Sequence, residues 1–161
     1  MIHHNLLMAT AISAAVAIGA CLDSTAPNQV APGDMALARS GRLQIEKDCS
    51  AYGGLALQTC TITSSNLKAI ELGTTITYLS DAAYPFLDTD IVLDPPGPGN
   101  NRAFGHCSIT LAPVDPGTRV GGCTISGGTG KFTHLHASVD VTYLGGPYYA
   151  WDGRYSFSPR D

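Results

Sequence analysis

Hydrophobic and polar residues alternate with a period of two on both sides of a glycine cluster in the last third of the chain. Before the cluster, Cys123 and Ile125 share one face. After it, apolar residues occupy every second position, namely Leu135, Ala137, Val139, Val141 and Tyr143. Such alternation is typical of strands with one buried face, and it predicts a hairpin over residues 120–143. Its turn contains Gly127, Gly128 and Gly130, because glycine permits the positive φ of a tight turn.

Short segments of the same kind precede and follow this hairpin. Glycine, proline and small polar residues separate them, and residues 67–72 fit either a strand or a helical turn. The clearer segments are 41–49, 55–63, 74–80, 88–94, 102–111 and 149–157. Seven or eight strands without an amphipathic helix predict an all-β fold, a single antiparallel β-barrel. The alternative is a β-sandwich. A barrel is favoured because the last segment is too aromatic on one face to be a solvent-exposed edge.

The first twenty residues differ in character from the rest of the chain. Residues 6–20 are apolar and uncharged, and this run is shorter than the ~20 residues of a spanning helix. It therefore predicts a signal peptide over residues 1–20. The sequence Ile18-Gly19-Ala20-Cys21 resembles the lipobox of bacterial lipoproteins, which implies cleavage before Cys21 and a lipid on that cysteine. The n-region departs from the usual pattern because it has no Lys or Arg, and an ordinary signal peptide is the alternative.

After Cys21, the chain contains small polar residues and prolines without periodicity up to residue 40. This composition predicts a lipidated flexible tether over residues 21–40, followed by the β-barrel domain over residues 41–161. Leu22 is not the aspartate that favours inner-membrane retention in many bacterial lipoproteins. The resemblance therefore favours anchoring to the outer membrane of the bacterial cell envelope.

The chain has five cysteines, and four remain once Cys21 is assigned to the lipid. Export into an oxidising compartment permits disulfides, and four cysteines allow three connectivities. Symmetric positions about predicted turns favour one of them, the pairing of Cys49 with Cys60 and of Cys107 with Cys123. A Cys₄ metal site is disfavoured because no C-x-x-C spacing is present.

Composition excludes several classes of function. The chain of 161 residues is 44% hydrophobic and 14% charged, which is too apolar for a disordered protein. A formal net charge of -4 gives no support to nucleic-acid binding, which requires clustered Lys and Arg. The glycines of the turn do not form a phosphate-binding loop, because the following residues predict a strand instead of a helix. We predict no cofactor.

Two groups of residues are weak candidates for a site. Aromatic residues on the last strands could line a ligand pocket at the mouth of a barrel, although such a stripe is more often core. They are Tyr143, Tyr149, Trp151, Tyr155 and Phe157. His134, His136 and Asp140 share one face of the predicted hairpin and are weak metal candidates. Sequential strand pairing would place a third ligand, His106, too far away, so we predict no metal.

The segment Gly127-Gly128-Thr129-Gly130-Lys131-Phe132 resembles the turn of small β-barrels of the allene oxide cyclase and dirigent type. A late W-x-G-x-Y strand, here from Trp151 to Tyr155, is similar to one found in small exported bacterial proteins. The resemblance covers roughly the last sixty residues, and it implies a β-barrel fold. Residues 133–136 depart from those families. Their activities are not carried over, because a fold does not imply a function.

These observations predict a lipid-anchored cell-envelope β-barrel protein with a binding or structural role. Its partners would be the membrane, through the N-terminal lipid, and a small apolar ligand; no oligomeric state is predicted. One alternative is a barrel isomerase or cyclase acting on an apolar small molecule, with Tyr78, Tyr143 or Tyr155 as polar donors. The other is a carrier of a small apolar ligand. A hollow interior of roughly 300 Å³ with a convergent tyrosine would favour the enzyme.

Overall fold

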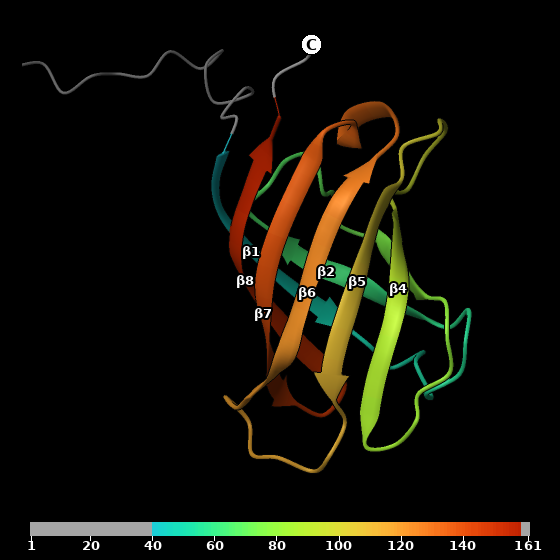
Figure 1. Ribbon diagram of the computed structural model, residues 1–161, viewed down its shortest axis with the longest axis vertical. Helices are drawn as coiled ribbons and strands as arrows, with labels where there is room; N and C mark the ends of the chain where they lie inside the picture. Colours follow the sequence, from blue (N-terminus) through green and yellow to red (C-terminus); the bar gives the residue numbers. More distant parts are fainter. Residues whose placement is uncertain (1–39, 159–161) are drawn as a thin grey trace, which may run out of the picture. The chain divides into compact units, whose positions relative to one another are not determined.

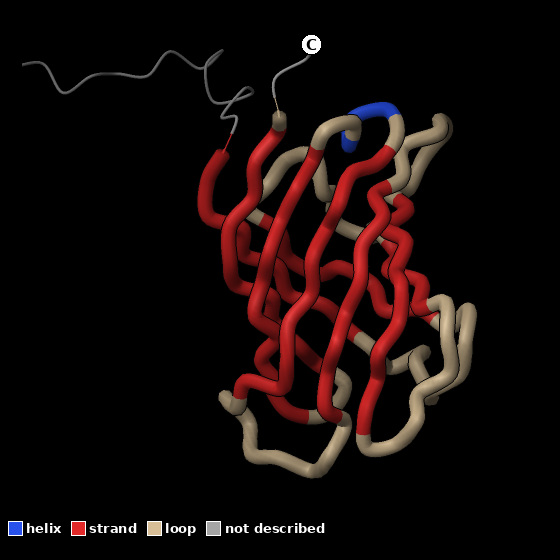
Figure 2. Tube along the Cα trace, viewed as in Figure 1, coloured by secondary structure: helices blue, strands red, loops and turns tan. Residues whose placement is uncertain are grey.

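The computed structural model describes residues 40–158, which form eight strands and one short 3-10 helix (Figure 1). In chain order these elements are β1 (Ser40–Asp48), β2 (Thr59–Ser65), β3 (Thr75–Tyr78), β4 (Phe86–Asp94), β5 (Ala103–Thr110), β6 (Arg119–Gly128), η2 (Gly130–Phe132), β7 (Leu135–Gly145) and β8 (Tyr148–Phe157). The connections lie at the two ends of the strands, with η2 at one of those ends (Figure 2).

The strands form a closed antiparallel barrel in which each strand pairs with its neighbours in sequence. Closure comes from β1 and β8, which pair over nine residues from Ser40↔Ser156 to Asp48↔Tyr148. This pairing leaves the sheet without an edge. The predicted all-β barrel is therefore confirmed, and the sandwich alternative is wrong.

Period-two alternation decides which side chains fill the barrel. In β7, Leu135, Ala137, Val139 and Val141 are buried, and the residues between them are exposed. Strand β1 alternates in the same way, with Leu43 and Ile45 inside. Each fully buried Leu, Ile or Val stabilises the fold by about 1.5–3 kcal/mol relative to an exposed position. The predicted inward face of the hairpin is thus confirmed.

Glycine in β8 allows the neighbouring backbone to approach closely. Gly153 pairs with Val139 of β7 and with Leu43 of β1. A Cβ added at Gly153 would lie 2.7 Å from Val139 Cα, and it would also collide with the carbonyl oxygen of Ser138. The glycine of the W-x-G-x-Y segment is therefore required by backbone packing between β7 and β8.

Both disulfides have the predicted connectivity. Cys107 and Cys123 are direct partners in the β5–β6 register, and they are bonded to each other. Cys49 follows β1 and is bonded to Cys60 in β2, next to the register pair Asp48↔Thr61. Directly opposed residues on antiparallel strands have the separation that a disulfide needs.

Some predicted element boundaries are wrong. The strand predicted over residues 55–63 begins only at Thr59, because residues 53–58 form a loop held by side chains. In that loop Gln58 Oε1 accepts hydrogen bonds from the backbone N–H groups of Gly53 and Leu55. Residues 67–72 form turns, with a hydrogen bond from Ile70 N–H to Leu67 O, and no strand.

The glycine turn also differs from the prediction. Gly127 and Gly128 belong to β6, and the connection consists of η2 and its flanking residues, with Gly130 at φ +57°. Strand β1 begins at Ser40, one residue before the predicted start of the barrel domain. The signal peptide, Cys21 and most of the predicted tether lie outside the described residues. The part of the chain that the structure describes contains no helix with the length and apolar character of a membrane span.

We expect Gly153→Ala to lower the free energy of unfolding by about 2 kcal/mol or more, as overpacking of a rigid contact does. Urea unfolding followed by circular dichroism measures this change. Gly53→Ala is the matched control, because its Cβ would lie at an ordinary 3.4 Å from Gln58 Oε1. Equal stability of the two variants would contradict the packing role of Gly153.

Candidate functional site

The inward face of β1 contains a lysine. Leu43, Ile45 and Lys47 follow one another at every second position, and all three point into the barrel. Lys47 is only 2% exposed. Lysine is almost never fully buried unless it has a partner, so the surroundings of this amine define the candidate site.

The Lys47 amine lies among aromatic side chains. Its Nζ is 2.6 Å from Tyr78 Oη. It also lies 4.7 Å from the ring centroid of Trp151, 5.4 Å from that of Tyr78 and 5.8 Å from that of Tyr149. Strand pairing explains this arrangement, because Lys47 is opposite Tyr149 and Ile45 is opposite Trp151 in the β1–β8 register.

Burial changes the proton affinity of this pair. Desolvation lowers the pKa of Lys47 to about 7, because the charged ammonium is disfavoured away from water. Burial, and then the neighbouring Tyr52 and Tyr149, raise the pKa of Tyr78. Within residues 40–158, no carboxylate forms an ion pair with Lys47. Near neutral pH the pair is therefore an intact phenol beside an amine that is neutral about half of the time.

A cavity of about 300 Å³ adjoins this pair. It lies at the end of the barrel opposite η2, where β1 and β5 end and β4 and β8 begin. Its residues provide an apolar wall and several polar groups. They are Lys47, Cys49, Ser50, Tyr52, Tyr78, Leu87, Ile109, Leu111, Gly146, Pro147 and Tyr149.

Tyr52 contributes a buried hydroxyl without a hydrogen-bond partner. Its ring packs against that of Tyr78, with the centroids 4.7 Å apart. Burial raises the pKa of Tyr52 as well, with smaller effects of Asp81 and Tyr149. An unpartnered buried hydroxyl costs about 1–3 kcal/mol, so the fold carries an unsatisfied polar group next to the cavity.

The Cys49–Cys60 disulfide fixes the aromatic cluster. Cys49 lines the cavity, and Tyr78 Oη lies 3.5 Å from Cys60 Sγ. The Tyr52 N–H donates to Cys49 O at 2.9 Å, and the Cys49 N–H donates to Pro147 O at 2.8 Å. The disulfide thus holds the loop with Tyr52 and the turn after β7 around the Lys47–Tyr78 pair.

A second cavity of about 240 Å³ adjoins the first. The two share Leu111, Gly146 and Tyr149, and the second is also lined by Tyr143. The Tyr143 and Tyr149 rings lie 5.4 Å apart between their centroids. The two cavities therefore lie next to each other at this end of the barrel.

The structure brings together some of the predicted pocket residues. Tyr149 lines both cavities, and Tyr143 lines the second. Trp151 is buried next to the Lys47 amine. Tyr155 and Phe157 lie further along β8 as partly buried residues packed on the core, and neither lines these two cavities.

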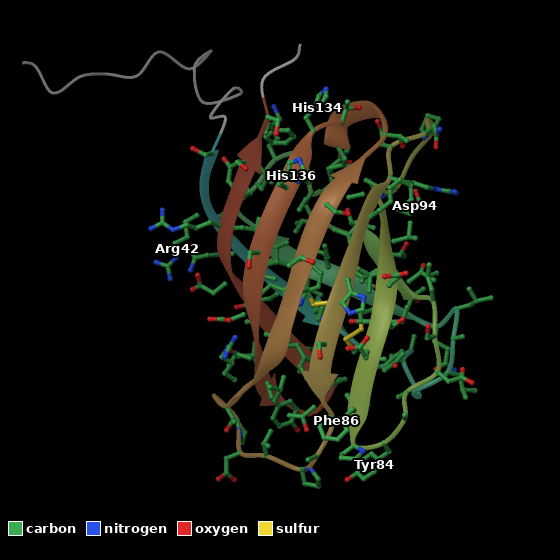
Figure 3. The ribbon with its side chains drawn as sticks, in the orientation of Figure 1. Arg42, Tyr84, Phe86, Asp94, His134 and His136 are labelled. Atoms are coloured by element: carbon green, nitrogen blue, oxygen red, sulfur yellow. A yellow bond between two sulfur atoms is a disulfide. The ribbon has the colours of Figure 1, made fainter. Side chains whose placement is uncertain are left out.

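The predicted metal candidates do not converge. Among residues 40–158, no three His, Cys, Asp or Glu side chains are placed to hold a metal ion. His134 and His136 lie at the η2 end of the barrel (Figure 3). His134 precedes β7 with φ +65°, so it does not continue the alternation of that strand as predicted. Asp140 instead forms an ion pair with Arg119.

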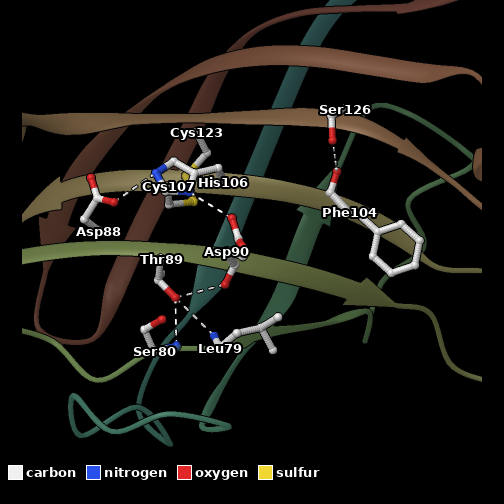
Figure 4. A network of polar contacts seen from close by, with 10 residues as sticks. All are labelled: Leu79, Ser80, Asp88, Thr89, Asp90, Phe104, His106, Cys107, Cys123 and Ser126. Atoms are coloured by element: carbon white, nitrogen blue, oxygen red, sulfur yellow. Dashed lines mark hydrogen bonds and ion pairs between the residues drawn. A yellow bond between two sulfur atoms is a disulfide. The ribbon is translucent and has the colours of Figure 1, made fainter.

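The acidic residues of β4 also have partners on the outer surface. His106 Nε2 lies 3.2 Å from Asp88 Oδ1, and its Nδ1 lies 3.0 Å from Asp90 Oδ1 (Figure 4). His106 is thus exposed on the polar face of β5, as predicted. These three residues lie outside the barrel and have no contact with the cavity.

Sequence reasoning missed two residues of the site, Lys47 and Tyr52. The signal for Lys47 was present, because the alternation of Leu43 and Ile45 places residue 47 on the same inward face. Tyr52 lies in a loop without periodicity, so no local pattern indicated its position. Tyr78 was named only as a donor for the alternative enzyme.

No protein-family model, curated protein or solved structure matches the chain. The relation to barrels of the allene oxide cyclase and dirigent type therefore stays a prediction based on the turn.

We expect Lys47→Met to abolish one component of the pH dependence of stability. Between pH 7 and the ordinary lysine value of 10.5, the unfolded chain binds a proton that the folded chain releases. The stability of the wild type therefore rises with pH in this window, by up to about 1.4 kcal/mol per pH unit relative to the variant. Urea unfolding between pH 7 and pH 9.5 measures this difference.

The control is Lys68→Met, at an exposed lysine. It should unfold with the same pH dependence as the wild type. If the Lys47→Met and Lys68→Met proteins had parallel stability profiles, the lowered pKa of Lys47 would be refuted.

Proposed function

We propose that this protein binds a small molecule with an apolar body and one oxygen-bearing polar group, and that it does so as an exported, lipid-anchored protein of the cell envelope. The observation that carries the proposal is the cavity of about 300 Å³ beside the buried Lys47–Tyr78 pair. Its lining combines apolar side chains with polar groups in defined positions, as ligand sites do.

The two sides of the cavity fit the two parts of such a ligand. Leu87, Ile109 and Leu111 provide apolar surface for the body. Lys47, Tyr78 and Tyr52 provide hydrogen-bonding groups on the other side. A ligand without a polar group would use none of these polar groups, which makes a carrier of purely apolar molecules the weaker interpretation.

The polar group is best described as a neutral oxygen, a carbonyl or a hydroxyl. The lining of the cavity contains Lys47 but no Arg, Asp or Glu. Because burial lowers the pKa of Lys47 to about 7, the site lacks the permanent positive charge that recognises a carboxylate or a phosphate. Hydrogen bonds to uncharged partners suit this environment.

A second candidate function is catalysis on the bound molecule, as in the predicted isomerase or cyclase. The Lys47–Tyr78 hydrogen bond of 2.6 Å favours it, because an amine with a pKa of about 7 can exchange a proton with a substrate, and the intact phenol beside it can donate a hydrogen bond. Chemical change of a bound ligand would separate the enzyme from a binding protein.

We expect the cavity to bind 2-acetylnaphthalene more tightly than 2-ethylnaphthalene, which has a similar shape but lacks the carbonyl oxygen. One hydrogen bond between neutral groups contributes about 0.5–1.5 kcal/mol, so the affinities should differ by roughly 2- to 13-fold. Isothermal titration calorimetry measures both. Leu111→Trp should weaken binding of both compounds, because Leu111 lines both cavities.

Leu55→Trp is the matched control, because Leu55 is 58% exposed and lies outside both cavities. It should bind both compounds as the wild type does. Absence of binding by the folded wild type, or equal loss in both Trp variants, would reject the cavity as the binding site.

The membrane anchor rests on the sequence Ile18-Gly19-Ala20-Cys21 at the end of an apolar segment. We expect protein extracted from membranes to carry a lipid on Cys21, and Cys21→Ser to release the protein from the membrane fraction. Intact-mass spectrometry of both fractions checks this. Ser24→Ala, three residues further on, should leave the anchor in place. An unmodified N-terminus in the membrane-extracted protein would reject lipidation.

A further inference from the structure

We infer that Lys47 forms an imine with an aldehyde or ketone bound in the cavity, so that the ligand class is a small carbonyl compound with an apolar body. This inference rests on the proposed function, because it requires that a ligand occupies the cavity. It specifies that the polar group of the ligand is a carbonyl, and that the ligand bonds covalently to Lys47.

The surroundings of the amine are those of a reactive group and differ from those of a structural lysine. A buried lysine that serves the fold commonly pairs with a carboxylate. The partly buried Lys131 has such a partner, since its Nζ lies 2.5 Å from Glu71 Oε1. Lys47 is more deeply buried, yet its hydrogen-bond partner is the phenol of Tyr78, and it lies on the wall of a cavity.

Desolvation supports the same interpretation. Only a neutral amine has a lone pair that can attack a carbonyl carbon, and lysines are activated in this way by apolar pockets. Burial lowers the pKa of Lys47 to about 7, whereas an exposed lysine with a pKa of about 10.4 is almost entirely protonated at neutral pH. The reaction would therefore be selective among the three lysines of the chain.

The reaction balances without an oxidant, a reductant or a cofactor. The Nζ lone pair forms a bond to the carbonyl carbon, and the carbonyl oxygen gains a proton to give a carbinolamine. The C–O bond then breaks, the oxygen leaves as water, and a C=N bond forms. Both amine protons end on that water molecule. Tyr78 Oη, 2.6 Å from Nζ, is placed to donate and recover the proton that the oxygen needs.

The aromatic cluster also suits the product. A protonated imine is a cation, and it would form at a position that lies within 6 Å of the ring centroids of Tyr78, Tyr149 and Trp151. Cations near aromatic faces are stabilised by the ring quadrupole.

The test uses 2-naphthaldehyde as the probe and sodium cyanoborohydride, which reduces an imine to a stable amine. The full-length protein in detergent is treated at pH 7, and the adducts are located by intact-mass spectrometry and peptide mapping. We expect one adduct on Lys47, with at least roughly tenfold preference over Lys68 and Lys131, because desolvation gives Lys47 a substantial neutral fraction at pH 7 and it lines the cavity.

Three variants define the roles of the residues. Lys47→Met should lose the adduct, whereas Lys68→Met should keep both the adduct and the wild-type affinity for 2-ethylnaphthalene. Tyr78→Phe should slow formation of the adduct at saturating 2-naphthaldehyde, a condition that separates the reaction rate from the affinity. The wild-type experiment is decisive even if one variant does not fold.

The outcomes separate the inference from the proposed function. If 2-naphthaldehyde displaces 2-ethylnaphthalene from the wild type, but the adducts lie on Lys68 and Lys131 or are absent, the imine is rejected and the binding function stands. If neither compound binds the folded protein, both are rejected. A selective Lys47 adduct that disappears in Lys47→Met supports both the imine and the binding function.

Discussion

The pairing of β1 with β8 is the contact on which the other features of this protein depend. It joins the first and last strands over nine residue pairs, and it turns an antiparallel meander into a closed surface with an inside and an outside. Closure buries every second residue of each strand, because these side chains all point into the same interior. Next to this pairing, Gly153 permits close backbone contact where β8 meets β7.

The same pairing creates the chemical environment of Lys47. Because Lys47 lies opposite Tyr149, and Ile45 lies opposite Trp151, the amine is enclosed by rings of β8 on one side and by Tyr78 of β3 on the other. An apolar residue of similar volume would fill this space without the desolvation cost of an amine. The site thus reduces the stability of the fold, which is common for groups that bind or react with a ligand.

The two ends of the barrel have different structures. At one end, η2 follows β6, and Phe132 is buried in the core together with Leu135. At the other end, the strands enclose two adjoining cavities, and the Cys49–Cys60 disulfide holds the loop beside them. Tyr155 and Phe157 belong to the core side of β8, whereas Tyr149 on the same face belongs to the cavity. The aromatic residues on this face of β8 therefore include both core residues and a residue of the candidate site.

The amino-acid sequence by itself determined the strands, the barrel class and both disulfides. These features depend on local patterns, namely alternation, turn residues and the symmetric placement of cysteines about turns. Each of these patterns lies within a single hairpin, so neighbouring residues are enough to predict it. Loops held by side chains were predicted less well, because the Gln58 contacts that replace a strand over residues 55–58 have no periodic signal. The lipid anchor on Cys21 stays a prediction, since it lies outside the described residues.

Only the tertiary structure decided that the barrel has a site. Alternation in β1 indicates that Lys47 points inward, but it does not show which side chains lie across the interior from it. Tyr78 is 31 positions away from Lys47 in the sequence, and their contact depends on the curvature and register of the whole sheet. Whether inward side chains meet and fill the interior, or leave a cavity, depends on strand tilt and on the sum of their volumes. Those quantities belong to the closed barrel and have no local sequence pattern.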